Sequence, residues 1–156
     1  MQVVKTVDEL KNAMFRIRPT GKTVGLVPTM GALHEGHLSL IKRARKENQI
    51  TVCSIFVNPT QFNNQDDLAK YPRTLDDDLK LIEPYVDFAF APTPEDVYKV
   101  PATEHYDFGT LERVMEGPMR PGHFNGVAII VKRLFDWVQP DRAYFGEKDF
   151  QQIAII

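Results

Sequence analysis

Two histidines three residues apart, His34 and His37, have the side-chain chemistry and the spacing to bind a phosphate. They lie between residues 23–27, an apolar and β-branched run typical of a buried strand, and residues 38–46, whose composition favours a helix with a basic last turn. Free backbone N–H groups and the positive end of the helix dipole favour an anion at such a strand-to-helix turn. The turn is therefore predicted to hold a phosphate.

The same histidine pair has other interpretations. If the helix starts near Leu33, both imidazoles lie on one face of its first turn and can donate to phosphoryl oxygens, while Gly36 lets a phosphate approach the backbone. One histidine can instead cap the helix, the pair can bind a metal, or both can face solvent. No third His, Cys or carboxylate stands at ligand spacing, which disfavours the metal.

Two amide side chains follow the next predicted strand, residues 50–57. Asn58 and Gln61 offer neutral donors and acceptors, which suit hydroxyl groups or a carboxylate. The alternative is an Asx turn with Gln61 in solvent, and these residues alone do not decide between the two.

Two further polar stretches carry candidate residues. Gly146, Lys148 and Asp149 resemble a second binding site for phosphate or ribose, although these residues taken alone favour a capped helix start with an exposed lysine. The acidic run 76–78 can bind Mg²⁺ near a triphosphate, or it is the solvated first turn of a helix.

Strands and helices alternate along the chain, which predicts an α/β fold with a doubly wound parallel sheet. Ligands bind at the carboxyl ends of the strands in that architecture, so the turns after three of the strands are expected to meet at one edge. The predicted strands are residues 2–4, 23–27, 50–57, 87–91 and 142–145. Three helices are predicted to start after Thr6, after residue 37 and after Thr74. A fourth helix is predicted from Asn125 or Gly126 to residue 138, and a fifth over 150–156. We predict irregular structure at 60–71 and a short hairpin or loop-rich excursion at 95–122.

Composition restricts the class of protein. The 156 residues, 43% of them hydrophobic, predict one domain over 1–156 with a hydrophobic core. A net charge of -2 does not favour nucleic acid or an anionic membrane as the main partner. The single Cys53 excludes an internal disulfide, and the apolar runs are too short to span a bilayer. We therefore expect a cytoplasmic protein.

Five segments together resemble the pantothenate synthetase (pantoate–β-alanine ligase) family of the HxGH nucleotidylyl-transferase superfamily. The resemblance runs the whole length of the chain in order. Its segments are PTMGALHEGH at 28–37, FVNPTQF at 56–62, YPRT at 71–74, RPGHFNGV at 120–127 and FGEKDFQQ at 145–152.

The resemblance implies a Rossmann-like domain and an ATP-dependent ligation in two steps. The carboxylate of (R)-pantoate attacks the α-phosphate of ATP and releases pyrophosphate, and the amine of β-alanine then attacks the pantoyl adenylate to give pantothenate and AMP. Such an adenylation needs positioning and charge stabilisation more than a protein nucleophile.

The resemblance also implies roles for single residues. His37, His34 and Lys148 would be catalytic. The ATP contacts would be Met30, Gly31, Ala32, Leu33, His34, Glu35, Gly36, His37, Gly146, Glu147, Lys148 and Asp149. The contacts to pantoate and β-alanine would be Gln61, Gln152, Met30, Asn58, Val127, Ile130 and Val131. Mg²⁺ would accompany the nucleotide, with Asp77 and Asp78 as candidate ligands, and the protein would be a homodimer.

Family members continue beyond residue 156 with further nucleotide-binding residues and a C-terminal lid domain. A chain of this length is therefore expected to have little or no turnover. One alternative is a nucleotidylyl transferase, which would need a basic pocket for a phosphorylated acceptor. A non-catalytic ligand-binding or dimerisation domain is another, whereas a fragment of an aminoacyl-tRNA synthetase is disfavoured because no basic RNA-binding surface is evident.

Overall fold

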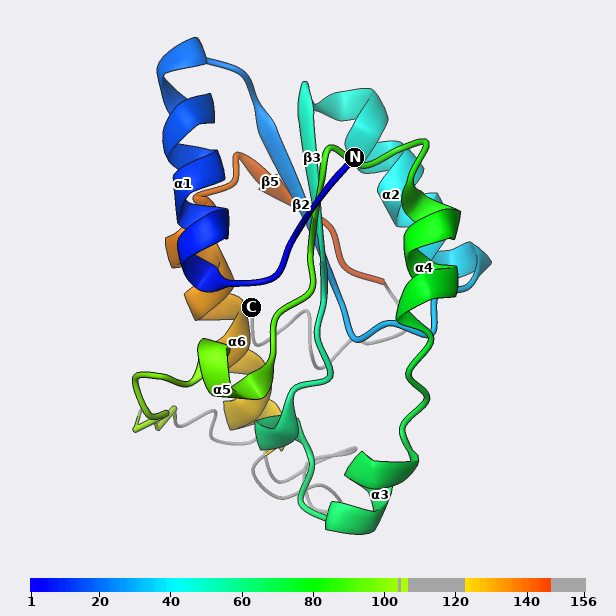
Figure 1. Ribbon diagram of the computed structural model, residues 1–156, viewed down its shortest axis with the longest axis vertical. Coiled ribbons are helices and arrows are strands. Elements are labelled where there is room, and N and C mark those ends of the chain that lie inside the picture. The colour runs from blue at the N-terminus through cyan, green and yellow to red at the C-terminus, as the bar shows by residue number, and fades with distance from the viewer. Residues whose placement is uncertain (104, 107–122, 147–156) are drawn as a thin grey trace.

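A parallel β-sheet forms the centre of the protein (Figure 1). The structure, a computed structural model, describes residues 1–103, 105–106 and 123–146. Within these residues the sheet has five strands in the order β1-β4-β3-β2-β5, and every pairing is parallel. The predicted parallel sheet is thus confirmed. Its strands are β1 Gln2–Val4, β2 Val24–Thr29, β3 Ile50–Ile55, β4 Phe88–Phe90 and β5 Arg142–Ala143.

Helices cover both faces of the sheet (Figure 1). The longer ones are α1 Val7–Ile17, α2 Glu35–Glu47, α4 Leu75–Ile82 and α6 His123–Val138. α1 and α6 lie on one face, and α2 and α4 lie on the other, so the fold is doubly wound. The short helices are α3 Gln65–Lys70, α5 Pro94–Val97 and the 3₁₀ turns η1 Arg18–Thr20 and η2 Pro59–Gln61. None of the described helices is both long enough and apolar enough to cross a membrane.

Two apolar clusters fill the space between the sheet and its helices. Leu26 and Val52 point to the face covered by α1 and α6, where they join the larger cluster. Val27 and Cys53, the next residues of the same strands, point to the face covered by α2 and α4. Because successive side chains of a strand alternate between faces, β2 and β3 need apolar residues on both faces, and most of their residues are apolar.

The structure corrects some of the predicted element boundaries. The segment 60–71, predicted to be irregular, contains the end of η2 and the whole of α3, which Asn64 caps by accepting from the backbone N–H of Asp66 at 2.8 Å. The short polar sequence lacks an apolar stripe, so its helical periodicity could not be recognised. Helix α6 begins at His123, before the predicted start at Asn125 or Gly126. The predicted helix 150–156 and most of the excursion 95–122 lie outside the described residues.

The threonines that precede α1 and α4 make different hydrogen bonds. Thr6 accepts from the backbone N–H of Glu9 at 3.1 Å, as predicted for the first helix. Thr74 precedes α4 as predicted, but its hydroxyl makes no capping bond. It lies 3.2 Å from each carboxylate oxygen of Asp78 instead. This difference matters for the site, because Asp78 reaches from α4 to the turn that follows β2.

Candidate phosphate turn and ligand cavity

The turn between β2 and α2, residues 30–34, ends at His34, and His37 follows in the first turn of α2. The two histidines cap α2 together. The Nδ1 atom of His34 accepts from the backbone N–H of Gly36 at 3.0 Å, and Nδ1 of His37 accepts from the backbone N–H of His34 at 3.2 Å. The ring centroids are 4.1 Å apart. A Cβ atom at Gly36 would lie 2.8 Å from the His34 ring, so the glycine makes room for this cap. Capping, one of the alternatives open from the sequence, is therefore what both rings do.

This arrangement determines which ring nitrogens can donate. A backbone N–H always donates, so Nδ1 of each imidazole must be unprotonated to accept from it. In the neutral rings the proton is then on Nε2 in both His34 and His37. The two histidines can thus offer Nε2–H donors to a phosphate while their Nδ1 atoms hold the start of the helix.

Most backbone donors of the turn are already used, which corrects the prediction of free N–H groups. Gly31 N–H donates to the hydroxyl of Thr29 at 3.2 Å. Ala32 and Leu33 N–H groups donate to the two carboxylate oxygens of Asp78, each at 3.0 Å. An anion is indeed present where the dipole favours one, but it is a side chain of α4 rather than a ligand. An incoming phosphate would therefore meet the histidine side chains instead of these amides.

Asn58 and Gln61, after β3, form a buried polar cluster rather than a solvent-exposed turn. Asn58 Nδ2 donates to Gln61 Oε1 at 3.1 Å and to the carbonyl of Gly126 in α6 at 3.2 Å. Its Oδ1 accepts from the hydroxyls of Thr60 and Tyr98. Because Gln61 Oε1 is used, its Nε2 group is the part of the amide that can donate to a ligand. Asn58 is fully buried and does not line the adjacent cavity, and its direct contact with substrate stays a prediction.

A cavity of about 180 Å³ lies between the end of β2, the end of β3 and α6. It brings together the predicted substrate residues Met30, Gln61, Val127, Ile130 and Val131, and it places His37 at the same cavity. The sequence interpretation assigned no ligand contact to six further lining residues, although four of them, Pro28, Thr29, Phe56 and Tyr71, stand in the segments that carry the family resemblance. The six residues are Pro28, Thr29, Ser54, Phe56, Tyr71 and Leu134. The cavity is mainly apolar on the α6 side, with Gln61 as its amide donor.

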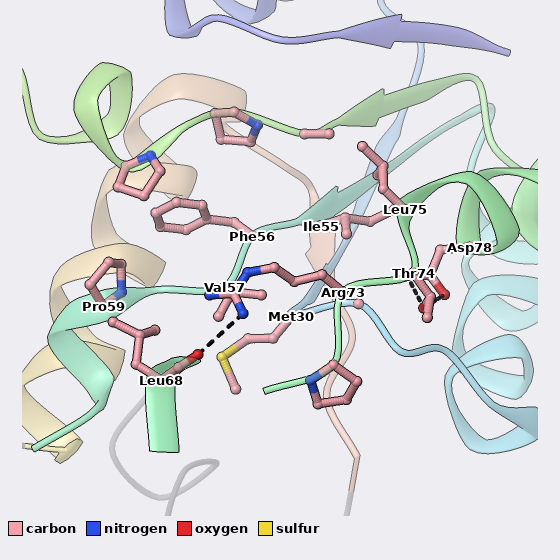
Figure 2. Close-up of a pocket in the computed structure, with 15 residues that line it drawn as sticks. Met30, Ile55, Phe56, Val57, Pro59, Leu68, Arg73, Thr74, Leu75 and Asp78 are labelled. Atoms are coloured by element: carbon pink, nitrogen blue, oxygen red, sulfur yellow. Dashed lines mark hydrogen bonds between the residues drawn. The ribbon is translucent and has the colours of Figure 1, made fainter. Parts of the chain in front are cut away.

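A second cavity, of about 310 Å³, shares Met30 and Phe56 with the first (Figure 2). It is bounded by the ends of β3 and β4 and by the start of α4. Arg73 runs along it and donates through Nη1 to the carbonyls of Leu68 and Tyr71 at 3.2 and 2.9 Å. Asp78 and Thr74 also line this cavity, across from Arg73. Met30 and Gly31 line it as well, so the cavity borders the turn between β2 and α2.

The two predicted magnesium ligands do not share one site. Asp77 is exposed, whereas Asp78 is 3% exposed and its oxygens already accept from the turn. Among the described residues no group of three His, Cys, Asp or Glu side chains could hold a metal ion. Asp77 and Asp78 therefore do not fit a bound Mg²⁺ as a pair, and Mg²⁺ as companion of the nucleotide stays a prediction.

Cys53 lies in β3 close to the site, but it is not a nucleophile. Burial raises the pKa of its thiol to about 12, and the nearby carboxylate of Asp78 also acts to raise this pKa. The thiol therefore stays protonated near neutral pH and packs as a small apolar side chain, as predicted.

The remaining candidates follow β5. Gly146 is described, and no other described heavy atom lies within 4 Å of where its Cβ would be, so a ligand has room to approach it. The other predicted contacts of this segment lie outside the described residues and stay predictions. They are Glu147, Lys148, Asp149 and Gln152.

A doubly wound sheet with a histidine-capped turn after β2 defines the class of α/β proteins that bind ligands at the carboxyl ends of parallel strands. Comparison with known proteins identifies the family. The model of the pantoate-beta-alanine ligase family matches residues 2–156, and the chain belongs to this family.

Individual relatives agree with this assignment. The chain is 60% identical to pantothenate synthetase of Bacteroides thetaiotaomicron, and the match covers 100% of this chain and 56% of the relative. The crystal structure of pantothenate synthetase from Thermus thermophilus is 50% identical with a TM-score of 0.91, covering 99% of this chain and 55% of that one.

A further crystal structure is that of pantoate-beta-alanine ligase from Francisella tularensis complexed with beta-gamma ATP and beta-alanine. It is 38% identical with a TM-score of 0.92, and the match covers 99% of this chain and 60% of that one. The chain thus spans little more than half the length of the relatives it matches.

Proposed function

We propose that this chain supplies the ATP- and pantoate-binding part of an ATP-dependent ligase that joins (R)-pantoate to β-alanine. In the first step a pantoate carboxylate oxygen forms a bond to the α-phosphorus, the bond from that phosphorus to the β-phosphate oxygen breaks, and pyrophosphate leaves. In the second step the β-alanine nitrogen bonds to the acyl carbon, AMP leaves, and the nitrogen loses its proton. The products are pantothenate, AMP and pyrophosphate.

The observation that carries this proposal is the cavity of about 180 Å³ beside His37. Gln61 offers an amide donor to a hydroxyl or carboxylate, and Val127, Ile130 and Val131 offer an apolar wall. A small hydroxy acid with two methyl groups matches both surfaces. Its carboxylate would lie next to the histidines at which ATP phosphates are proposed to bind.

The two imidazoles would stabilise charge rather than act as nucleophiles. Their Nε2–H groups can donate to phosphoryl oxygens, where negative charge grows as the phosphoanhydride bond breaks. Their Nδ1 bonds to the backbone hold both rings in place beforehand, so the donors need no reorganisation in the transition state. His37 at the cavity and His34 beside it are the proposed catalytic residues of the described chain, with Lys148 as the third.

A nucleotidylyl transferase of the same superfamily would need cationic side chains for a phosphorylated acceptor. Among the described residues that line the cavity, His37 is the only ionisable base, and no Lys or Arg is present. This lining supports an uncharged-tailed carboxylate as the acceptor.

Binding measurements test the proposal directly. Isothermal titration calorimetry of the 156-residue chain with ATP and with pantoate is expected to show binding of each. No binding of either ligand would sink the proposal and favour a non-catalytic role. In a pyrophosphate-exchange assay with pantoate we expect little or no turnover, because the chain spans 56% of its relative's length. AMP as the product of the full-length protein would exclude a nucleotidylyl transferase.

The resemblance also supports a homodimer and Mg²⁺ with the nucleotide, and both belong to the proposal. Sedimentation of the chain measures the first. Titration of ATP binding with and without Mg²⁺ measures the second.

A further inference from the structure

The turn that is proposed to bind ATP makes hydrogen bonds to a residue from a distant part of the chain. Ala32 and Leu33 donate their backbone N–H groups to Asp78, which lies 46 and 45 residues further on, in α4. The hydroxyl of Thr74 lies 3.2 Å from both oxygens of the same carboxylate. One buried side chain thus joins the start of α4 to the turn.

The backbone of the turn needs such a restraint. Gly31 and Ala32 have φ angles of +81° and +50°, and the left-handed region is unfavourable for alanine. A Cβ atom at Gly31 would lie 3.0 Å from Asp78 Oδ2, so the carboxylate packs closely against the glycine. Local sequence therefore does not explain why Ala32 adopts this conformation, whereas its hydrogen bond to Asp78 does.

Packing does not replace these hydrogen bonds. The cavity of about 310 Å³ lies behind the turn, and Met30, Gly31, Thr74 and Asp78 all line it (Figure 2). On this side the turn borders the cavity, with the Ile55 side chain as a close neighbour of Gly31. The hydrogen bonds to Asp78 consequently hold the turn to α4 and oppose its movement away from that helix.

Asp78 has a charge suited to this role. It is 3% exposed and its described hydrogen bonds come from backbone N–H groups and a hydroxyl, not from a cation. A buried carboxylate that lacks hydrogen-bond donors is strongly unfavourable. The Asp78 carboxylate therefore favours the conformation in which the amides of Ala32 and Leu33 point toward it. Leu33 immediately precedes His34, the N-cap residue of α2. The position of Leu33 therefore determines where the His34 and His37 rings lie and where their Nε2 atoms point.

We propose that Asp78 is a positioning residue for ATP: by occupying the amides of Ala32 and Leu33, it sets the turn so that His34 and His37 face the phosphates. This inference rests on the proposed function, because it takes ATP as the ligand of the turn. It assigns Asp78 a contact with the protein backbone rather than with a metal ion. It also implies that the phosphates bind beside this carboxylate without displacing it.

The substitution Asp78→Asn tests the inference with little change of shape. One amide oxygen can still accept from one N–H group, but the new NH₂ group faces the other donor. Since hydrogen bonds to charged groups are among the stronger ones, we expect the Kd for ATP to rise about tenfold or more. The Kd for pantoate should stay within about twofold, because Gln61 and α6 do not contact Asp78. A residue needed only for folding would weaken both ligands together.

Asp76→Asn is the matched control, because Asp76 is exposed in the same first turn of α4 and the substitution removes the same charge. We expect wild-type ATP affinity for it. Thr74→Val removes one hydrogen bond to Asp78 and should weaken ATP binding in the same direction by a smaller factor. If Asp78→Asn fails to fold and loses pantoate binding, the ATP affinity of Thr74→Val tests the inference instead.

The outcomes separate this inference from the proposed function. If the wild-type chain does not bind ATP, the proposed function is wrong. If it binds ATP and neither Asp78→Asn nor Thr74→Val weakens that binding relative to Asp76→Asn, the inference is wrong and the function stands. Tighter ATP binding by Asp78→Asn would also overturn it, because the carboxylate would then compete with the phosphates.

Discussion

The histidine turn and the ligand cavity lie side by side at one edge of the sheet, but they are built differently. The turn takes its donors from consecutive residues after β2, and a single distant side chain, Asp78, stabilises it. The cavity takes its lining from β2, β3, η2 and α6, which lie up to about a hundred residues apart in the sequence. His37 belongs to both regions.

The two regions should therefore respond differently to substitution. The donors of the turn come from neighbouring residues, so a change there should alter donor positions and leave the rest of the sheet intact. The cavity depends on the close approach of η2 and α6, so a change at that contact should affect folding and ligand binding together. The predictions below test whether the two regions are separable in this way.

The largest effect is expected from Gly126→Ala, at the contact of η2 with α6. The added Cβ would lie 2.4 Å from the carbonyl oxygen of Thr60 and 2.9 Å from the backbone nitrogen of Gln61. Because these are backbone atoms, α6 must move, and we expect a loss of about 3 kcal/mol in the free energy of unfolding. Urea denaturation measures this, and calorimetry should show that pantoate binding is lost.

Asp136→Ala is the control for that substitution, because Asp136 is an exposed residue of the same helix. Its ion pair with Lys132 is on the surface, so its loss should change stability by less than about 1 kcal/mol. Equal destabilisation by both variants would show that the close approach at Gly126 is not what builds the cavity.

An intermediate effect is expected from Asn58→Ala. It removes the acceptor of the Tyr98 hydroxyl bond and the donor to Gln61 Oε1 from a buried cluster, which should cost about 2 kcal/mol. Pantoate affinity should fall more than ATP affinity, because Gln61 loses its fixed orientation. Thermal denaturation and calorimetry measure both effects. The exposed Asn63→Ala is the control, and parallel loss of both ligands in Asn58→Ala would contradict the separation of the two regions.

The smallest effect on stability is expected at His34, where two substitutions separate capping from ligand binding. His34→Ala removes the cap and should cost about 1 kcal/mol, whereas His34→Asn keeps a capping acceptor and should cost much less. Both remove the Nε2–H donor, so both should weaken ATP binding equally in calorimetry. Recovery of ATP affinity in His34→Asn would mean that the cap, and not the donor, serves the nucleotide.

Much of the architecture was predictable from local patterns. The apolar runs in β2 and β3 and the capping residue Thr6 predict strands and a helix start that the structure confirms. Helix α3 was missed because its short, mainly polar sequence carries no apolar stripe. The histidine turn was recognised, but the prediction of free N–H groups was wrong, because nothing near Ala32 in the sequence indicates that Asp78 accepts from it.

Local sequence was sufficient to predict the succession of strands and helices along the chain, the apolar strands buried on both faces, and the two histidines at a strand-to-helix turn. These follow from neighbouring residues, because periodicity and capping act over a few positions. Only the tertiary structure decided which atoms of the turn remain available for a ligand and how Gln61 is oriented. Asp78 and Asn58 settle those points through contacts across 46 and 68 residues, and such contacts exist only once α4 and α6 have packed on the sheet.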